Sequence, residues 1–134
     1  MTLPDPIADL RTLLLADPGV AALAGESVYG GELPEAQATV APAVAVVIRP
    51  AGGIGRLKLM KTRMIRVDTI CYAATLKDSW TLHLAVREAL ETLGRPTGCV
   101  KSVEMAAEAA NARDSAKQWP TCYASYSVLT TTTV

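Results

Sequence analysis

A glycine-rich, basic segment, residues 49–61, lies between two strand-like runs and holds the residues best suited to chemistry. It contains Gly53-Ile54-Gly55-Arg56-Leu57-Lys58, which opens with the G-x-G spacing of nucleotide-binding loops. In those loops a helix follows, and its N-terminus holds the phosphate. Here Lys58 stands in the third glycine position, a strand-like run follows, and the G-K-[ST] ending of a P-loop is missing. The segment therefore predicts no nucleotide site.

The same segment concentrates positive charge. Five basic residues and no acid lie between Arg56 and Arg66, although the chain has 13 residues of each sign. Three interpretations remain: an ordinary solvated hairpin, docking on an acidic protein partner, or sequence-independent contact with a DNA backbone. No aromatic residue lies in the segment, so stacking on single-stranded bases is not predicted. The candidate DNA-proximal residues are Arg56, Lys58 and Lys61.

The nucleophiles and metal ligands show no catalytic spacing. Cys71, Cys99 and Cys122 form no C-x-x-C pair, and His83 is the single histidine. A zinc site needs closely paired ligands, and no G-x-S-x-G elbow is present. We expect buried structural thiols and a partly buried structural histidine. No catalytic residue, metal ligand or cofactor is predicted, and the chain is not expected to be an enzyme.

Composition is typical of one globular domain spanning residues 1–134. Half of the residues are hydrophobic, none is Phe, and the core must use small and β-branched side chains. High apolar content favours an oligomer. The zero net charge predicts no general attraction to nucleic acid or membrane. With no membrane-spanning run and no signal-like start, we expect a protein of the cytoplasm or of a particle assembled there.

Helix signals begin the chain. Asp5-Pro6 supplies a cap and a first helical residue, and apolar residues follow at helical spacing. Asp17-Pro18 repeats the signal and predicts a short second turn that Gly25 closes. Residues 27–39 are expected to be a linker.

Two strand-like runs flank the glycine-rich segment. The apolar run 43–48 predicts a buried strand, and residues 63–72 alternate, with Arg66 and Asp68 facing away from Val67 and Cys71. We expect an antiparallel pair with a long projecting β-hairpin arm, which suits contact with a subunit or partner. The interface candidates on the arm are Arg49, Gly52, Gly53, Gly55, Arg56, Leu57, Lys58, Leu59 and Lys61.

A second main helix is predicted from a cap at Asp78 or Ser79 to about Leu93. Its polar face carries Trp80 and Leu84, which either lie under a neighbouring loop or form a subunit interface. A third strand (99–105), a loop or frayed helical turn (106–117) and a last strand (122–129) follow. These elements predict an α+β fold: two main helices on one face of a mainly antiparallel sheet of about four strands, in the order α-β-β-α-β-β.

The order and spacing of these segments resemble the tail terminator, or tail completion, proteins of long-tailed bacteriophages and gene transfer agents. The resemblance covers nearly the whole chain. Five stretches carry it: Ile7–Leu23, Val28–Pro34, Ala41–Val47, Asp68–Ala73 and Ala85–Leu90.

The resemblance implies a virion protein that forms a ring, usually six-fold. The ring would cap the completed tail tube and join it to the head–tail connector or stopper, with genomic DNA passing through its lumen. The implied partners are further copies of the chain, the tail tube protein, the connector and, transiently, DNA. Two alternatives stay open: another neck or tube ring component, such as a stopper or tail tube protein, and a small ligand-binding α+β domain.

Overall fold

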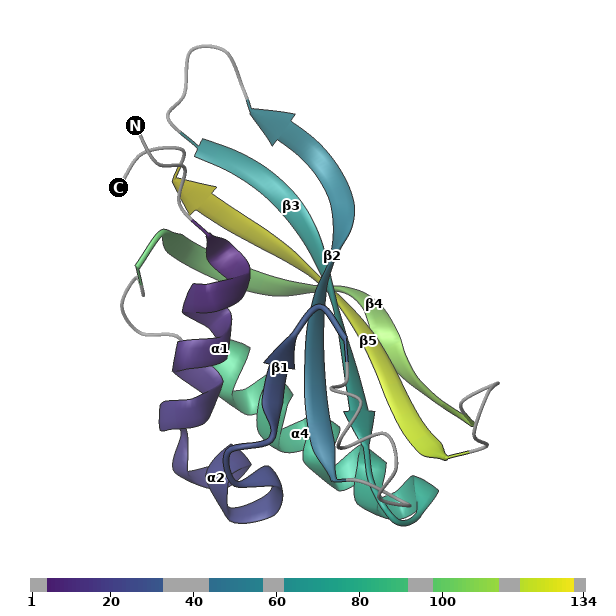
Figure 1. Cartoon of the computed structure of the whole chain (residues 1–134). Helices are drawn as coiled ribbons and strands as arrows, with labels where there is room; N and C mark the ends of the chain where they lie inside the picture. Colours follow the sequence, from purple (N-terminus) through teal and green to yellow (C-terminus); the bar gives the residue numbers. More distant parts are fainter. Residues whose placement is uncertain (1–4, 33–43, 57–61, 92–97, 114–118, 132–134) are drawn as a thin grey trace.

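A computed structural model describes residues 5–32, 44–56, 62–91, 98–113 and 119–131, with the backbone alone for 53–56 (Figure 1). The elements are, in chain order, α1 (Pro6–Ala16), α2 (Pro18–Ala24), β1 (Val28–Gly30), β2 (Ala45–Arg56), β3 (Thr62–Tyr72), α4 (Leu76–Glu91), β4 (Val100–Arg113) and β5 (Pro120–Thr131).

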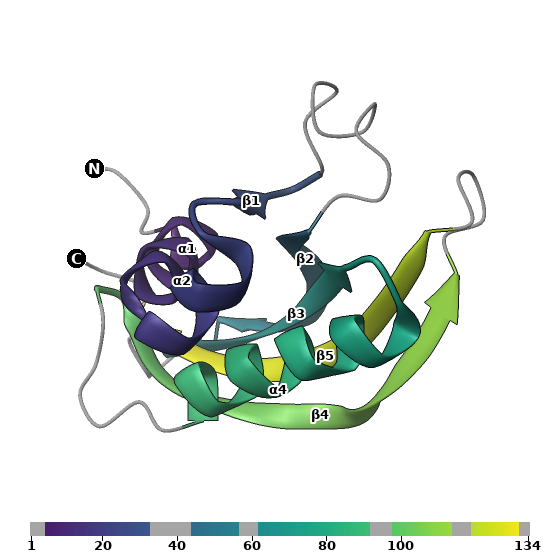
Figure 2. The same cartoon turned by 90° about the horizontal axis from the view of Figure 1, so that it is seen from below.

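One sheet of five strands has the order β1-β2-β3-β5-β4. β1 runs parallel to β2, and the other pairs are antiparallel. Figure 2 shows α1, α2 and α4 on the same side of this sheet, inside its curve. The predicted α+β class is confirmed. The sheet nevertheless has one strand more than expected and a parallel pair, and α2 is a helix in its own right.

Both N-terminal helix signals are confirmed. The Asp5 carboxylate accepts hydrogen bonds from the backbone N–H groups of Ile7 and Ala8, at 3.1 and 3.2 Å. The Asp17 carboxylate accepts one from the N–H of Val20 at 3.0 Å. A proline follows each aspartate, where the missing N–H costs no helical hydrogen bond. Gly25 ends α2 with φ +60°, a left-handed conformation that glycine adopts without steric cost.

The predicted cap of the long helix is wrong. α4 begins at Leu76, and the hydroxyl of Thr75 accepts a hydrogen bond from the N–H of Asp78 at 3.1 Å. Ser79 is buried inside the helix and donates its hydroxyl to the carbonyl of Leu76 at 2.7 Å. Several capping residue types follow one another here, so local sequence does not select one of them. The predicted end near Leu93 lies outside the described residues.

The expected linker contains a strand. Residues 28–30 pair in parallel with Val46–Ile48 of β2, and Val28 is fully buried. Three residues are too few to show an alternating pattern, so only the tertiary contact with β2 identifies this strand. Residues 33–43 of the expected linker lie outside the described part of the chain.

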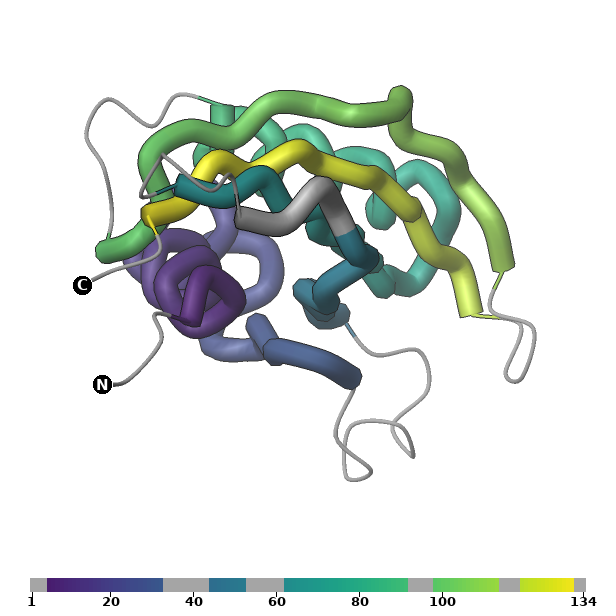
Figure 3. The backbone as a smooth tube through the Cα atoms, turned by 90° about the horizontal axis from the view of Figure 1, so that it is seen from above, coloured from purple at the N-terminus to yellow at the C-terminus, as the bar shows by residue number. Residues whose placement is uncertain are grey.

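The expected loop or helical turn at residues 106–117 is also wrong as far as Arg113. β4 continues through the alanine-rich stretch and pairs with β5 down to Arg113 opposite Pro120. Figure 3 shows β4 following the curve of β5 along its length. Register shifts interrupt the pairing on both sides of Ala107, as bulges do where a strand curls. Tertiary pairing thus overrides the weak strand propensity of alanine.

The core lies between the helices and the inner face of the sheet. Along β5, Cys122, Ala124, Tyr126 and Val128 point inward and are almost fully buried. Leu10, Leu14 and Val20 from the N-terminal helices meet them, together with Leu82, Val86 and Leu90 from α4. The alternation predicted for residues 63–72 is confirmed in β3. Within the described residues, no helix covers the other face of the sheet.

Candidate interaction surfaces

The glycine-rich segment is mostly strand. β2 runs through it to Arg56 and stays paired with β3, with register shifts between Pro50 and Gly53 and between Gly53 and Gly55. Gly52 has φ +90°, which side-chain-bearing residues rarely adopt, so a glycine is needed at this irregular position. The predicted antiparallel pair is confirmed. As far as Arg56 the segment is therefore an extension of the sheet, and the next described element is the strand β3, whereas a phosphate loop would be followed by a helix.

The predicted contact residues of the arm fall into three groups. Arg49 is exposed on β2, and Gly52 is exposed at the bulge. The backbones of Gly53, Gly55 and Arg56 belong to β2. Leu57, Lys58, Leu59 and Lys61 lie outside the described residues. Their roles as interface or DNA-proximal residues, and that of Arg56, remain predictions.

The face of the sheet opposite the helices forms one candidate surface, which we call the open face. It consists of Arg49, Arg66, Asp68, Tyr72 and Tyr123, whose strand positions alternate with core residues. Arg49 and Arg66 are exposed, and the other three are half-buried. Asp68 accepts a 2.6 Å hydrogen bond from the hydroxyl of Ser125, beside it on β5.

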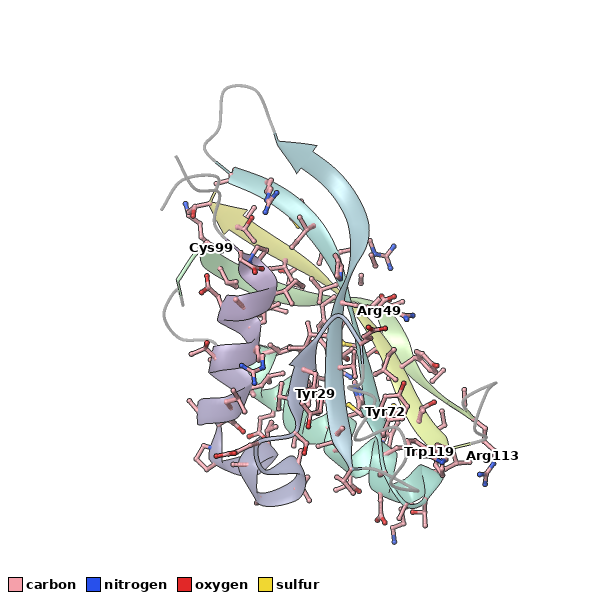
Figure 4. The ribbon with its side chains drawn as sticks, viewed as in Figure 1. Tyr29, Arg49, Tyr72, Cys99, Arg113 and Trp119 are labelled. Atoms are coloured by element: carbon pink, nitrogen blue, oxygen red, sulfur yellow. The ribbon has the colours of Figure 1, made fainter. Side chains whose placement is uncertain are left out.

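Aromatic side chains gather at one end of this face. Tyr72 and Trp119 contact each other edge to face, with ring centroids 6.3 Å apart. Figure 4 places both near the end of β3, below Arg49. Tyrosine, tryptophan and arginine are enriched in protein–protein interfaces. Sequence reasoning missed this cluster, although the alternation of Tyr123 with Cys122 was visible, because the pattern alone does not say which face the helices cover.

The structure separates the predicted pair on the long helix. Trp80 is half-buried against the core, with its ring centroid 5.2 Å from that of His83. Leu84 is 46% exposed. Leu84 is therefore available for a contact, whereas much of the Trp80 ring is already used in packing.

Leu84 belongs to a second candidate surface on the helix layer, which we call the helix surface. Leu23 of α2 is 44% exposed and lines a hollow of about 300 Å³ with Val44, Asp78 and Thr81. Thr81 precedes Leu84 by three residues, and Glu88 follows it by four, so these three share the outer side of α4. The helix surface consists of Leu23, Asp78, Thr81, Leu84 and Glu88.

This hollow offers few groups for a small ligand. Its polar lining is the Asp78 carboxylate and the Thr81 hydroxyl, and that hydroxyl donates to the carbonyl of Lys77 at 3.1 Å. Ligand sites usually combine an apolar wall with several convergent polar groups. An apolar depression beside exposed leucines is better suited to a protein surface.

The three thiols are buried, as predicted. Burial raises the pKa of Cys99 to about 12 and that of Cys122 to about 11, and the pKa of Cys71 also lies far above its usual value. Metal ligands and nucleophiles are thiolates, so these groups are poor candidates for either role at neutral pH. Within the described residues, no three His, Cys, Asp or Glu side chains lie close enough to hold a metal ion.

His83 is more deeply buried than expected, with no exposed surface. Among the described residues, neither of its ring nitrogens has a hydrogen-bond partner, and the same holds for the hydroxyls of Thr69 and Tyr126. Burial lowers the pKa of His83, and the nearby Arg87 lowers it further, against the opposing effect of Glu108 and Glu91. The imidazole is therefore held neutral inside the core.

We expect His83→Leu to reduce the pH dependence of stability. The pKa of His83 lies below 6.5 in the folded state, so the unfolded chain binds more protons at this residue. The wild type therefore loses stability as the pH falls below the ordinary histidine pKa. The variant keeps similar bulk but has no group to protonate. Urea unfolding at pH 7.5 and 5.5 measures this. If both proteins lose the same free energy of unfolding between pH 7.5 and 5.5, other groups cause the pH dependence.

Comparison with known proteins gives a fold relationship. No protein-family model and no curated protein matches the chain. A chain in a solved structure described as the virion of a native gene transfer agent particle matches it with a TM-score of 0.67. The match covers 92% of both chains at 18% sequence identity. The two chains therefore share a fold over most of their length.

No helix within the described residues is long and apolar enough to cross a membrane.

Proposed function

We propose that this chain is a non-catalytic structural protein of a phage-like particle. It forms a ring that caps the completed tail tube and joins it to the head–neck connector. The resemblance to tail terminators implies that this ring is hexameric. DNA passes through the lumen of this ring. The protein works in the tail or neck of the particle, after assembly in the host cytoplasm.

The observation that carries this proposal is the fold shared with a gene transfer agent virion chain over 92% of each chain. The sequence resemblance to tail terminators points to the same class of particle and adds the position at the tail end. The surfaces are also suitable, because a ring subunit needs two different contact patches. The open face and the helix surface lie on opposite sides of the sheet.

The first experiment measures the mass of the purified protein in solution by light scattering, followed by imaging of particles that contain it. We expect a ring, or a monomer that becomes a ring at the tail end, next to the tube on one side and the connector on the other. A ring found within the tube or on the head side would indicate a tail tube or stopper protein. A monomer that never joins a particle would overturn the proposal.

A further inference from the structure

The charges of the chain are strongly segregated, although they sum to zero. Residues 1–44 carry six acids and one base, whereas residues 45–75 carry six bases and one acid. The remaining residues are balanced, with six of each. In space, the basic segment supplies Arg49 and Arg66 to the open face, and Asp17 and Glu26 flank α2 beside the helix surface.

We propose that the helix surface of one copy docks on the open face of the next copy. The helix surface combines the exposed Leu23 and Leu84 with the carboxylates of Asp78 and Glu88. The open face combines two exposed arginine side chains with half-buried tyrosines and the half-buried Asp68, so its net charge is positive. An apolar centre with complementary charges around it is the usual composition of a specific interface.

Like charges disfavour the symmetric alternatives. Two open faces in contact would bring Arg49 and Arg66 of one copy against the same arginines of the other. Two helix surfaces in contact would oppose Asp78 and Glu88 to themselves, although Lys77, beside Asp78, offsets part of this negative charge. Like charges across an interface suppress such pairings, so attraction favours the pairing of two different surfaces.

This pairing has a consequence for assembly. The two surfaces lie on opposite faces of one sheet, so each copy can bind one neighbour on each side. A head-to-tail contact between different patches produces a closed ring when the rotation between copies closes. The inference thus rests on the proposed function for the ring itself, and it identifies the surfaces that build the ring.

A charge exchange tests the inference directly. Arg66→Glu changes the open face, Glu88→Arg changes the helix surface, and the double variant carries both changes. Lys101→Glu is the matched control, because this exposed lysine lies near the start of the edge strand β4 and outside both surfaces. Circular dichroism confirms folding, and light scattering across protein concentrations and two salt concentrations measures association.

We expect each single reversal to weaken self-association about tenfold or more, and the double variant to recover most of it. The wild-type association should weaken with added salt, and the Lys101→Glu variant should behave as the wild type. If association occurs only on tails, imaging of rings on tail ends serves as the readout for the wild type and the same four variants.

Other outcomes separate the two proposals. Rings that form equally in the wild type and in both single reversals would overturn the pairing and leave the proposed function standing. Single reversals that keep the ring but lose attachment to the tube would also overturn it, since the surfaces would then bind a different protein. A wild type without any ring, in solution or on tails, would overturn both.

Discussion

Replacing Tyr126 with alanine lowers the free energy of unfolding by about 3–5 kcal/mol. The large side chain fills the centre of the core, so its removal leaves a cavity. Among the described residues, Tyr126 has the largest of the fully buried side chains. It lies on β5 opposite Val67 and Met105, in the middle of the sheet. This loss is a large fraction of the free energy of unfolding of a typical domain, which is about 5–15 kcal/mol. Urea unfolding measures it.

Two further variants make this prediction specific. Tyr123→Ala removes the same side chain three residues away, on the half-buried open face, and should cost about 1 kcal/mol. Tyr126→Phe keeps the ring and removes a hydroxyl that has no hydrogen-bond partner among the described residues. Its cost should stay below about 1 kcal/mol. If Tyr126→Phe costs as much as Tyr126→Ala, the hydroxyl has a stabilising partner and the account of the core is wrong.

The second large effect is expected at Gly98, where α1 is tied to β4. The carboxylate of Asp9 accepts a 2.8 Å hydrogen bond from the N–H of Cys99, 90 residues away in sequence. Gly98 lies directly against this carboxylate and has φ +57°. In Gly98→Ala, the new methyl group would overlap the carboxylate and displace it. We expect the free energy of unfolding to fall by about 2–4 kcal/mol. Part of this comes from the strain of alanine at a positive φ, and part from weakening the hydrogen bond to the Asp9 carboxylate.

Gly25→Ala is the comparison variant. Gly25 also has a positive φ of +60°, and a methyl group there would meet no atom within 4 Å. Its ψ of −125° lies outside the left-handed helical region, so this variant should cost only the backbone term of a sparsely populated conformation, about 1–3 kcal/mol. A larger loss in Gly98→Ala, measured by thermal or urea unfolding, supports the hydrogen bond between Asp9 and Cys99 as a source of stability. Equal losses in the two variants would contradict it.

The sequence alone was sufficient to predict the elements that depend on interactions between neighbouring residues. Asp5 and Asp17 cap helices through N–H groups two or three residues away, so their roles are readable without any tertiary structure. The central strands were equally readable, because a strand with one buried face must alternate. The lack of a C-x-x-C motif or a phosphate loop likewise depends on short spacing, which a linear sequence shows directly.

Only the tertiary structure identified the elements that depend on residues far away in the sequence. β1 is a strand because β2 lies beside it, and the alanine-rich part of β4 is a strand because β5 provides hydrogen bonds to it. The helices cover one face of the sheet, and this choice leaves Tyr72 and Tyr123 on the other. Alternation marks two faces of a strand but does not say which face the helices will bury. The surfaces available for assembly are therefore a property of the packed fold.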